Sequence, residues 1–191
     1  MSYAYWRVRT YEGLQGKKNS YKGRNEDFVN DKNKEKIARN NLLGIMNENF
    51  YNYCKNHTKE DIKNKYSDKN FKPILNVPYR FMKLFPNAKE SYVYCGEQTL
   101  GVHVNKHNDV SLPVFQDMQK ILNNTDNVYQ ERNVSSPNGI KGVAFEVMDY
   151  KGERYAMVVR TDKLGRLIFW KTFHIQHGVK DKWQKINLAK K

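Results

Sequence analysis

The chain has 191 residues, with 34 Lys and Arg against 20 Asp and Glu, which gives a formal net charge of +14 at pH 7. This length is sufficient for one substantial hydrophobic core. The basic excess is spread over both halves and favours a polyanionic partner, of which nucleic acid is the commonest. A Lys-rich protein without such a partner is the alternative.

Targeting and redox signals are sparse. The N-terminus has no apolar segment of the signal-peptide kind, and no apolar run is long enough to span a membrane. Cys54 and Cys95 are the only cysteines, and neither belongs to a CxxC or Cys/His ligand pattern. We therefore predict free thiols in a reducing cytoplasm and no contact with a membrane.

In chain order, the first ninety residues are predicted to be mostly helical. Alternation favours a short strand over residues 2–11, and residues 13–33 are polar and typical of a loop. Apolar positions at helical spacing predict a helix over residues 34–55, and Thr58-Lys-Glu-Asp61 resembles a capping box that begins a second helix. A helical turn is expected over residues 79–85, between two prolines.

Strands dominate the pattern after residue 90. The expected elements are a strand over 91–96, helices over 97–107 and 112–123, a strand over 128–132, a loop over 135–139, and strands over 143–150, 154–161 and 166–174. The last three are joined by loops of two to four residues, which predicts an antiparallel meander. The fold class is therefore α+β, with an N-terminal helical region and a C-terminal antiparallel sheet of about four strands packed against helices.

His103 and His107 are candidate catalytic residues because their spacing places both on one face of a helix. The same spacing suits a metal ion, but no third ligand is near and no His-Glu-x-x-His motif is present. We expect neither a metal nor another cofactor. A structural hydrogen-bonding role is the alternative for these histidines.

The strands over residues 155–174 supply further candidates because side chains alternate along a strand. Thr172 and His174 share one face, whereas Lys171 points to the other unless a β-bulge intervenes. If Thr161 pairs with Arg166, Tyr155 lies on the face of Thr172 and Arg160 on the face of Lys171. A slip of one residue reverses that assignment.

We therefore predict that Thr172 and His174 act as one catalytic unit. Tyr155, Arg160 and Lys171 are the substrate-binding candidates, and sheet packing is the alternative for Tyr155.

These residue types suit RNA cleavage without a metal. RNA carries its own nucleophile, the 2′-hydroxyl, so cleavage needs a base, an acid for the leaving 5′-oxygen, and cations on the developing phosphorane charge. Histidine serves as base or acid near neutral pH, and Arg, Lys and Thr contact phosphate oxygens. No carboxylate cluster for Mg²⁺ is evident, which disfavours a two-metal nuclease.

Residues 92–175 also resemble a known family. The segment Tyr94-Cys-Gly-Glu-Gln-Thr-Leu-Gly-Val-His103-Val-Asn-Lys-His107 and the strands Tyr155-Ala-Met-Val-Val-Arg160 and Phe169-Trp-Lys-Thr-Phe-His174 are similar to the phage-associated nuclease domains of the barnase–EndoU–colicin–RelE superfamily. The resemblance implies a helical segment on a four-stranded antiparallel sheet, metal-independent RNA cleavage, and an origin in a phage or mobile element.

Residue by residue, the resemblance points to His103, His107, Arg160, Lys171 and Thr172, and the face argument adds His174. The domains that follow are a helical extension of unknown role over residues 1–90, a nuclease domain over 91–178 and a basic tail over 179–191.

The prediction is a toxin-like ribonuclease that acts on tRNA or other RNA in the cytoplasm of a bacterial host. An immunity protein or a host protein is a further partner that this interpretation allows. The alternative is a non-catalytic protein that binds nucleic acid or a host factor.

Overall fold

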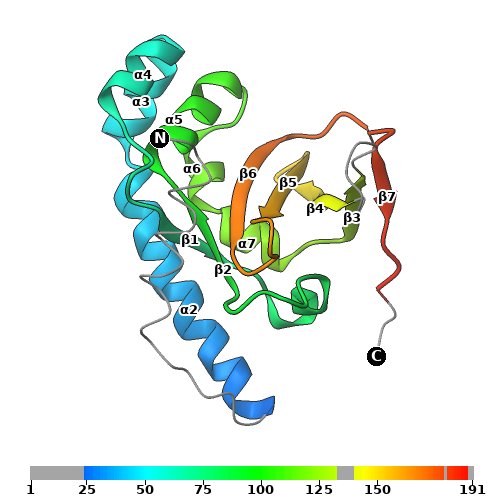
Figure 1. Cartoon of the computed structure of the whole chain (residues 1–191). Helices are drawn as coiled ribbons and strands as arrows, with labels where there is room; N and C mark the ends of the chain where they lie inside the picture. Colours follow the sequence, from blue (N-terminus) through cyan, green and yellow to red (C-terminus); the bar gives the residue numbers. More distant parts are fainter. Residues whose placement is uncertain (1–23, 133–139, 179, 189–191) are drawn as a thin grey trace.

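The structure is a computed structural model that describes residues 24–132, 140–178 and 180–188 (Figure 1). The strand predicted over residues 2–11 and the loop predicted over 135–139 lie outside the described residues. The helical elements are α2 (Arg24–Ile45), α3 (Glu48–Asn56), α4 (Lys59–Lys65), η1 (Tyr79–Leu84), α5 (Glu97–Lys106), α6 (Leu112–Gln116) and α7 (Met118–Asn123). The strands are β1 (Lys72–Asn76), β2 (Tyr92–Cys95), β3 (Asn127–Arg132), β4 (Ile140–Tyr150), β5 (Glu153–Thr161), β6 (Ile168–Ile175) and β7 (Trp183–Lys185).

Local capping explains where the first helices begin. Thr58 and Asp61 form the predicted capping box, in which each side chain accepts from the backbone N–H of the other residue. The single helix predicted over residues 34–55 is in fact two helices, because Asn47 caps α3 by accepting from the N–H of Phe50 at 3.0 Å. None of the helices described here combines the length and apolar character needed to cross a membrane.

The sheet is larger than predicted. Within the described residues it has seven strands in the order β1-β2-β6-β5-β4-β3-β7, instead of about four. It is also mixed, because β2 pairs in parallel with β6 while the other neighbouring strands are antiparallel. The α+β class is consistent with this structure, and the three-strand meander of β4, β5 and β6 is confirmed.

The two faces of the sheet differ in what covers them. The main core joins the apolar sides of the helices to one face, on which Phe145, Met157 and Phe173 are buried. We call this the helix-covered face. The opposite face carries a smaller buried cluster of Tyr129, Ala144, Ala156, Val158 and Trp183, and we call it the site face.

Packing continues across the predicted domain boundaries. The main core runs from Leu42 in α2 to Phe173 in β6, and α2 lies beside β1 at one edge of the sheet (Figure 1). At the other edge, β7 pairs with β3. The boundaries predicted near residues 90 and 178 therefore coincide with no break in the sheet or the core.

Candidate functional site

Helix α5 is positioned by a cap from a distant residue. Its N-cap is Gly96, which has no side chain to accept a hydrogen bond, and Asp68 takes over that role. The Asp68 carboxylate accepts from the Thr99 N–H at 2.9 Å and from the Thr99 hydroxyl at 2.5 Å. A Cβ at residue 96 would lie 2.0 Å from Asp68 Oδ1, so glycine is required for this cap.

The cap fixes the turn that carries His103. The Nδ1 atom of His103 lies 3.0 Å from the carbonyl oxygen of Thr99, so Nδ1 carries the proton and donates it to that acceptor. The ring then packs edge-on against Trp170 of β6, with 4.7 Å between centroids. His103 is therefore held from two sides.

Three histidines form a continuous stack along β6. The ring of His107 lies 6.0 Å from that of His103 and 5.5 Å from that of His174, with interplanar angles of 26° and 23°. The pairing of β2 with β6 is limited to Ile168 and Phe169, and the rings of His103 and His107 contact Trp170 and His174 in the remaining part of β6. The structure thus brings together the histidines predicted from α5 and from the last strand of the meander.

A β-bulge decides which side chains of β6 share a face. Thr172 pairs with Val158 and Trp170 with Val159, so Lys171 is an extra residue without a partner in β5. The bulge turns Lys171 and Thr172 to the same side. Because Val158 belongs to the cluster on the site face, Thr172 lies there too, and His174 joins them opposite Ala156.

The same register settles the positions of Arg160 and Tyr155. Thr161 pairs with Ile168 rather than Arg166, and Arg160 lies on the site face with Lys171 because it alternates in step with Ala156 and Val158. Tyr155 pairs with Ile175 and lies on the helix-covered face, where it is 5% exposed and its ring stacks on Phe173 at 5.4 Å. The structure therefore places Tyr155 in the core, apart from the other predicted substrate-binding residues.

A hydrogen-bond chain assigns the tautomer of His174. The amide nitrogen of Gln176 donates to the carbonyl oxygen of Gly178, so the amide oxygen faces His174. That oxygen lies 2.8 Å from Nε2 of His174, which must therefore carry the proton. The lone pair of neutral His174 is then on Nδ1, a buried atom with no hydrogen-bond partner among the described residues.

Burial keeps the histidine stack neutral. Desolvation lowers the pKa of His103 and that of His174 to about 4, and it also lowers the pKa of His107. The charge of Lys180 contributes to the lowered pKa of both His107 and His174. At neutral pH the rings therefore present unprotonated nitrogens, as a general base requires.

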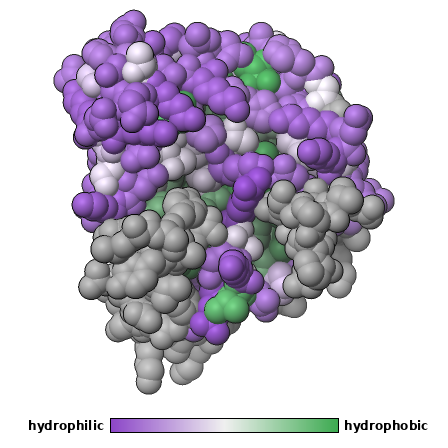
Figure 2. All heavy atoms as spheres, turned by 45° about the horizontal axis from the view of Figure 1, so that its top comes forward, coloured by the Kyte–Doolittle hydropathy of each residue, from purple (hydrophilic) through white to green (hydrophobic). Residues whose placement is uncertain are grey.

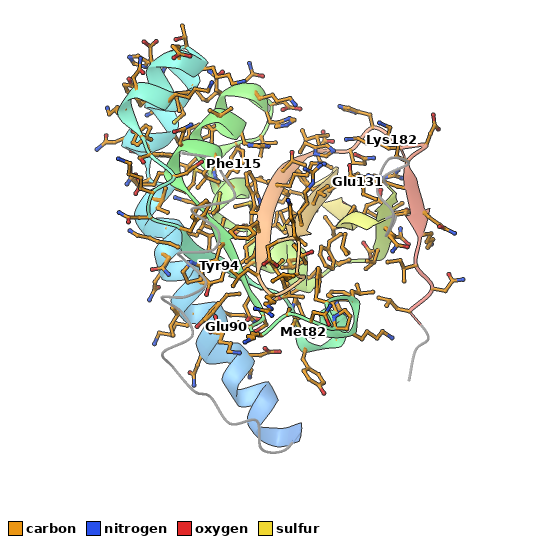
Figure 3. All side chains as sticks on the ribbon, viewed as in Figure 1. Met82, Glu90, Tyr94, Phe115, Glu131 and Lys182 are labelled. Carbon is orange, nitrogen blue, oxygen red and sulfur yellow. The ribbon has the colours of Figure 1, made fainter. Side chains whose placement is uncertain are left out.

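Sequence reasoning missed two charged residues at this site. The sequence predicts Lys180 in a basic tail, but its segment joins β6 to β7 and its charge also contributes to the lowered pKa of Lys171. Glu131 at the end of β3 accepts two hydrogen bonds of 2.9 Å from Lys171 Nζ and lies 3.7 Å from Arg160 Nη2. Figure 3 shows Glu131 at the same end of the molecule as Lys182, in the segment that joins β6 to β7.

No pattern along the sequence identifies either residue, because both reach the site through strand pairing across the sheet. Figure 2 shows that the coloured part of the face turned toward the viewer is mostly hydrophilic. Within the described ranges, no group of three or more His, Cys, Asp or Glu side chains is arranged to hold a metal ion.

Comparison with protein-family models, with curated proteins and with solved structures finds no match. The interpretation of the site therefore depends on its own geometry.

Proposed function

We propose that the protein is a metal-independent RNA endonuclease that cleaves by attack of the 2′-hydroxyl on the adjacent phosphorus. The observation that carries this proposal is the stack of His103, His107 and His174, formed by residues from α5 and β6. It lies beside a strand that presents Lys171 and Thr172 on the face shared with Arg160. Bases and phosphate-binding cations are thus gathered where a phosphodiester needs both.

His174 is the proposed general base. Its Nε2–H is engaged by Gln176, and the lone pair on Nδ1, an atom that is buried in the free protein, accepts the proton of the 2′-hydroxyl once bound RNA opens access to it. The 2′-oxygen then forms a bond to phosphorus, and the bond from phosphorus to the 5′-oxygen breaks. The products are a 2′,3′-cyclic phosphate and a free 5′-hydroxyl.

His107 is the proposed general acid, which protonates the leaving 5′-oxygen. Its ring stacks on His174, and although burial and the charges of Lys106 and Lys180 lower its pKa, the carboxylate of Asp109 acts in the opposite direction. A bound phosphodiester anion raises the pKa of a neighbouring imidazole further, because it favours the charged form. Binding of the substrate therefore favours the protonated form of His107, which a general acid requires.

The other residues position the site or bind the phosphate. His103 is a positioning residue, because its Nδ1–H is bonded to Thr99 and its ring is packed on Trp170. Arg160 and Lys171 bind the phosphate oxygens, and the Thr172 hydroxyl donates to one of them. Arg160 Nε is buried without a hydrogen-bond partner in the described part of the chain, whereas Arg160 Nη2 lies 3.7 Å from Glu131 Oε2.

The resemblance of residues 92–175 to the barnase–EndoU–colicin–RelE superfamily supports the same proposal. It adds the expectations of a phage or mobile-element origin, of toxin-like action on tRNA or other RNA in a bacterial cytoplasm, and of an immunity or host protein as partner. The charge of +14 is consistent with a polyanionic substrate.

The test is incubation with total RNA in EDTA, followed by analysis of the RNA ends. We expect cleavage to 2′,3′-cyclic phosphate and 5′-hydroxyl ends, and its loss in a variant with His103→Ala, His107→Ala and His174→Ala together. The matched control is His57→Ala, because His57 is exposed and stacks on Tyr53 in α3. Intact RNA with the unaltered protein, or equal cleavage by the triple variant, contradicts the proposal.

Binding of nucleic acid without cleavage is the second candidate function. The basic charge favours it without any need for the histidine stack, since neutralised phosphates release counterions. It predicts that RNA is recovered intact, with an affinity that falls steeply as salt is raised. The end analysis separates the two functions in one experiment.

A further inference from the structure

A carboxylate lies between the two cations that the proposed function assigns to phosphate binding. Both oxygens of Glu131 are 2.9 Å from Lys171 Nζ, and Oε2 is 3.7 Å from Arg160 Nη2. The Glu131 side chain is 15% exposed and that of Lys171 is 28% exposed. The pair is therefore partly shielded from water, where an ion pair is stronger than at an open surface.

The side chains of Glu131, Arg160 and Lys171 meet across a position of β4 that carries no side chain. Glu131 on β3 pairs with Gly142 on β4, and β5 and β6 follow with Arg160 and Lys171. A Cβ at residue 142 would lie 3.3 Å from Glu131 Oε2, 3.3 Å from Arg160 Cγ and 2.7 Å from the Val159 carbonyl oxygen. The absence of a side chain at Gly142 thus permits a contact that spans four strands.

Glu131 also opposes the other influences on Lys171. Burial lowers the pKa of Lys171, and the charges of Arg160 and Lys180 lower it further. Glu131 raises that pKa, both through its hydrogen bonds and through its charge. Three cations converge here from β5, from β6 and from the segment after β6, and Glu131 is the carboxylate that faces Lys171.

We propose that Glu131 is a positioning residue that keeps Lys171 protonated and fixed beside Arg160, so that the two cations form a preorganised clamp for one phosphodiester group. The clamp is the phosphate-binding part of the proposed nuclease site, so the inference rests on the proposed function. The opposite role is that Glu131 occupies the clamp as an internal anion, which RNA must displace. The two roles predict opposite effects of removing the charge.

The first experiment measures the protonation of Lys171 in the absence of RNA. The 13Cε resonance of Lys171 is titrated with pH in the unaltered protein, in Glu131→Gln and in Glu131→Asp. We expect Glu131→Gln to lower the pKa of Lys171 by about one unit or more, and Glu131→Asp to lower it less. An unchanged Lys171 titration in Glu131→Gln overturns the inference, whether or not the protein cleaves RNA.

The second experiment measures binding of an RNA oligonucleotide whose 2′-hydroxyls are replaced by hydrogen, which binds through phosphates but cannot be cleaved. For Glu131→Gln we expect an affinity similar to that of the unaltered protein at pH 6 and a steeper loss than in the unaltered protein as the pH is raised to 9, as Lys171 loses its proton. Glu131→Asp should retain most of the affinity at pH 9. Tighter binding by Glu131→Gln across the whole pH range overturns the inference in favour of an internal competitor.

The control is Glu153→Gln, which removes one carboxylate from an exposed position at the other end of β5. It should change neither the titration of Lys171 nor the pH profile of binding. If Glu131→Gln fails to fold, Glu131→Asp still tests the inference through the predicted smaller shift. Failure of the proposed nuclease function is visible separately, as intact RNA in the cleavage assay while Lys171 still responds to residue 131.

Discussion

At the scale of single residues, the histidine stack couples the site to pH. His103 and His174 have a pKa lowered to about 4 because burial penalises the imidazolium form. The unfolded chain has the ordinary pKa of about 6.5 for each residue. Between these values the unfolded state binds more protons than the folded state, so stability must fall as the pH is lowered.

The prediction is that the free energy of unfolding decreases as the pH is lowered from 6.5 towards 4. The slope should be on the order of 1 kcal/mol per pH unit for each buried histidine. Urea unfolding at intervals of half a pH unit measures it. Replacing His103 and His174 together by Gln should flatten the slope. Parallel slopes in the unaltered protein and the double variant would refute the effect.

At the scale of elements, the site depends on where α5 begins. Serine is normally a better N-cap than glycine, but at residue 96 it would collide with Asp68, which supplies the cap from outside the helix. The position of Thr99 then fixes His103. The geometry of the histidine stack therefore depends on one long-range hydrogen-bonded cap.

We predict that Gly96→Ser destabilises the protein by roughly 1–3 kcal/mol, because it overpacks this contact. Asp68→Gly should cost about 1–2 kcal/mol through loss of the cap. In the double variant the clash with the Asp68 carboxyl group is removed, but a Cβ at residue 96 would still lie 2.7 Å from the Cα of residue 68, so the cost should be only partly less than the sum. A double-mutant cycle from urea unfolding measures the coupling, and strict additivity would show that the two positions do not compete.

Helix α7 is bound to the edge of the sheet by a side-chain amide that makes the hydrogen bonds of a neighbouring strand. The amide of Gln119 in α7 accepts from the Asn76 N–H at 2.7 Å and donates to the Asn76 carbonyl oxygen at 2.9 Å. Both residues are buried. Edge strand β1 thereby gains hydrogen bonds of the kind that a neighbouring strand would supply.

Gln119→Ala is expected to lower the free energy of unfolding by roughly 2–4 kcal/mol, because it leaves a buried N–H and a buried carbonyl unsatisfied. The measurement is urea unfolding at pH 7. Gln184→Ala is the matched control, since Gln184 is exposed on β7 and should change stability by less than about 0.5 kcal/mol. Equal effects of the two substitutions would contradict the proposed anchoring role.

At the scale of the whole molecule, the chain after β6 returns to complete the site face. It passes from β6 to the opposite edge of the sheet, where β7 pairs with β3 (Figure 1). Trp183 begins β7 and is 7% exposed, with its ring 5.6 Å from that of Tyr129. The segment that brings Lys180 to the site is therefore anchored by an aromatic side chain on β7.

Trp183→Ala should destabilise the protein by roughly 3–5 kcal/mol, the usual cost of removing a buried indole. It should also weaken RNA binding, because the segment that carries Lys180 loses its anchor. Thermal unfolding and salt-dependent RNA binding test both consequences. Lys182→Ala, at an exposed position one residue earlier, is the stability control. Unaltered stability of the Trp183 variant would remove the anchoring argument.

The amino-acid sequence by itself predicted most of the local elements and the residue types of the candidate site. Local features depend on neighbours within a few residues, so the sequence alone predicts them. Examples are helical periodicity, the Thr58 capping box, and turns at glycine. The same holds for His103 in α5 and His107 at its C-cap, which are four residues apart, and for Thr172 and His174, which are two residues apart and share a face of β6. The sequence does not predict the edge strand β1, because Pro73 is unfavourable in a strand except at an edge.

The tertiary structure decided how those elements combine. The parallel pairing of β2 with β6, the bulge at Lys171, and the register that buries Tyr155 all depend on strands far apart in the chain. Because side chains alternate with a period of two, a shift of one residue moves every group to the opposite face. The contact of Glu131 with Lys171 needs four aligned strands and an empty position at Gly142, and no pattern within a single strand contains that information.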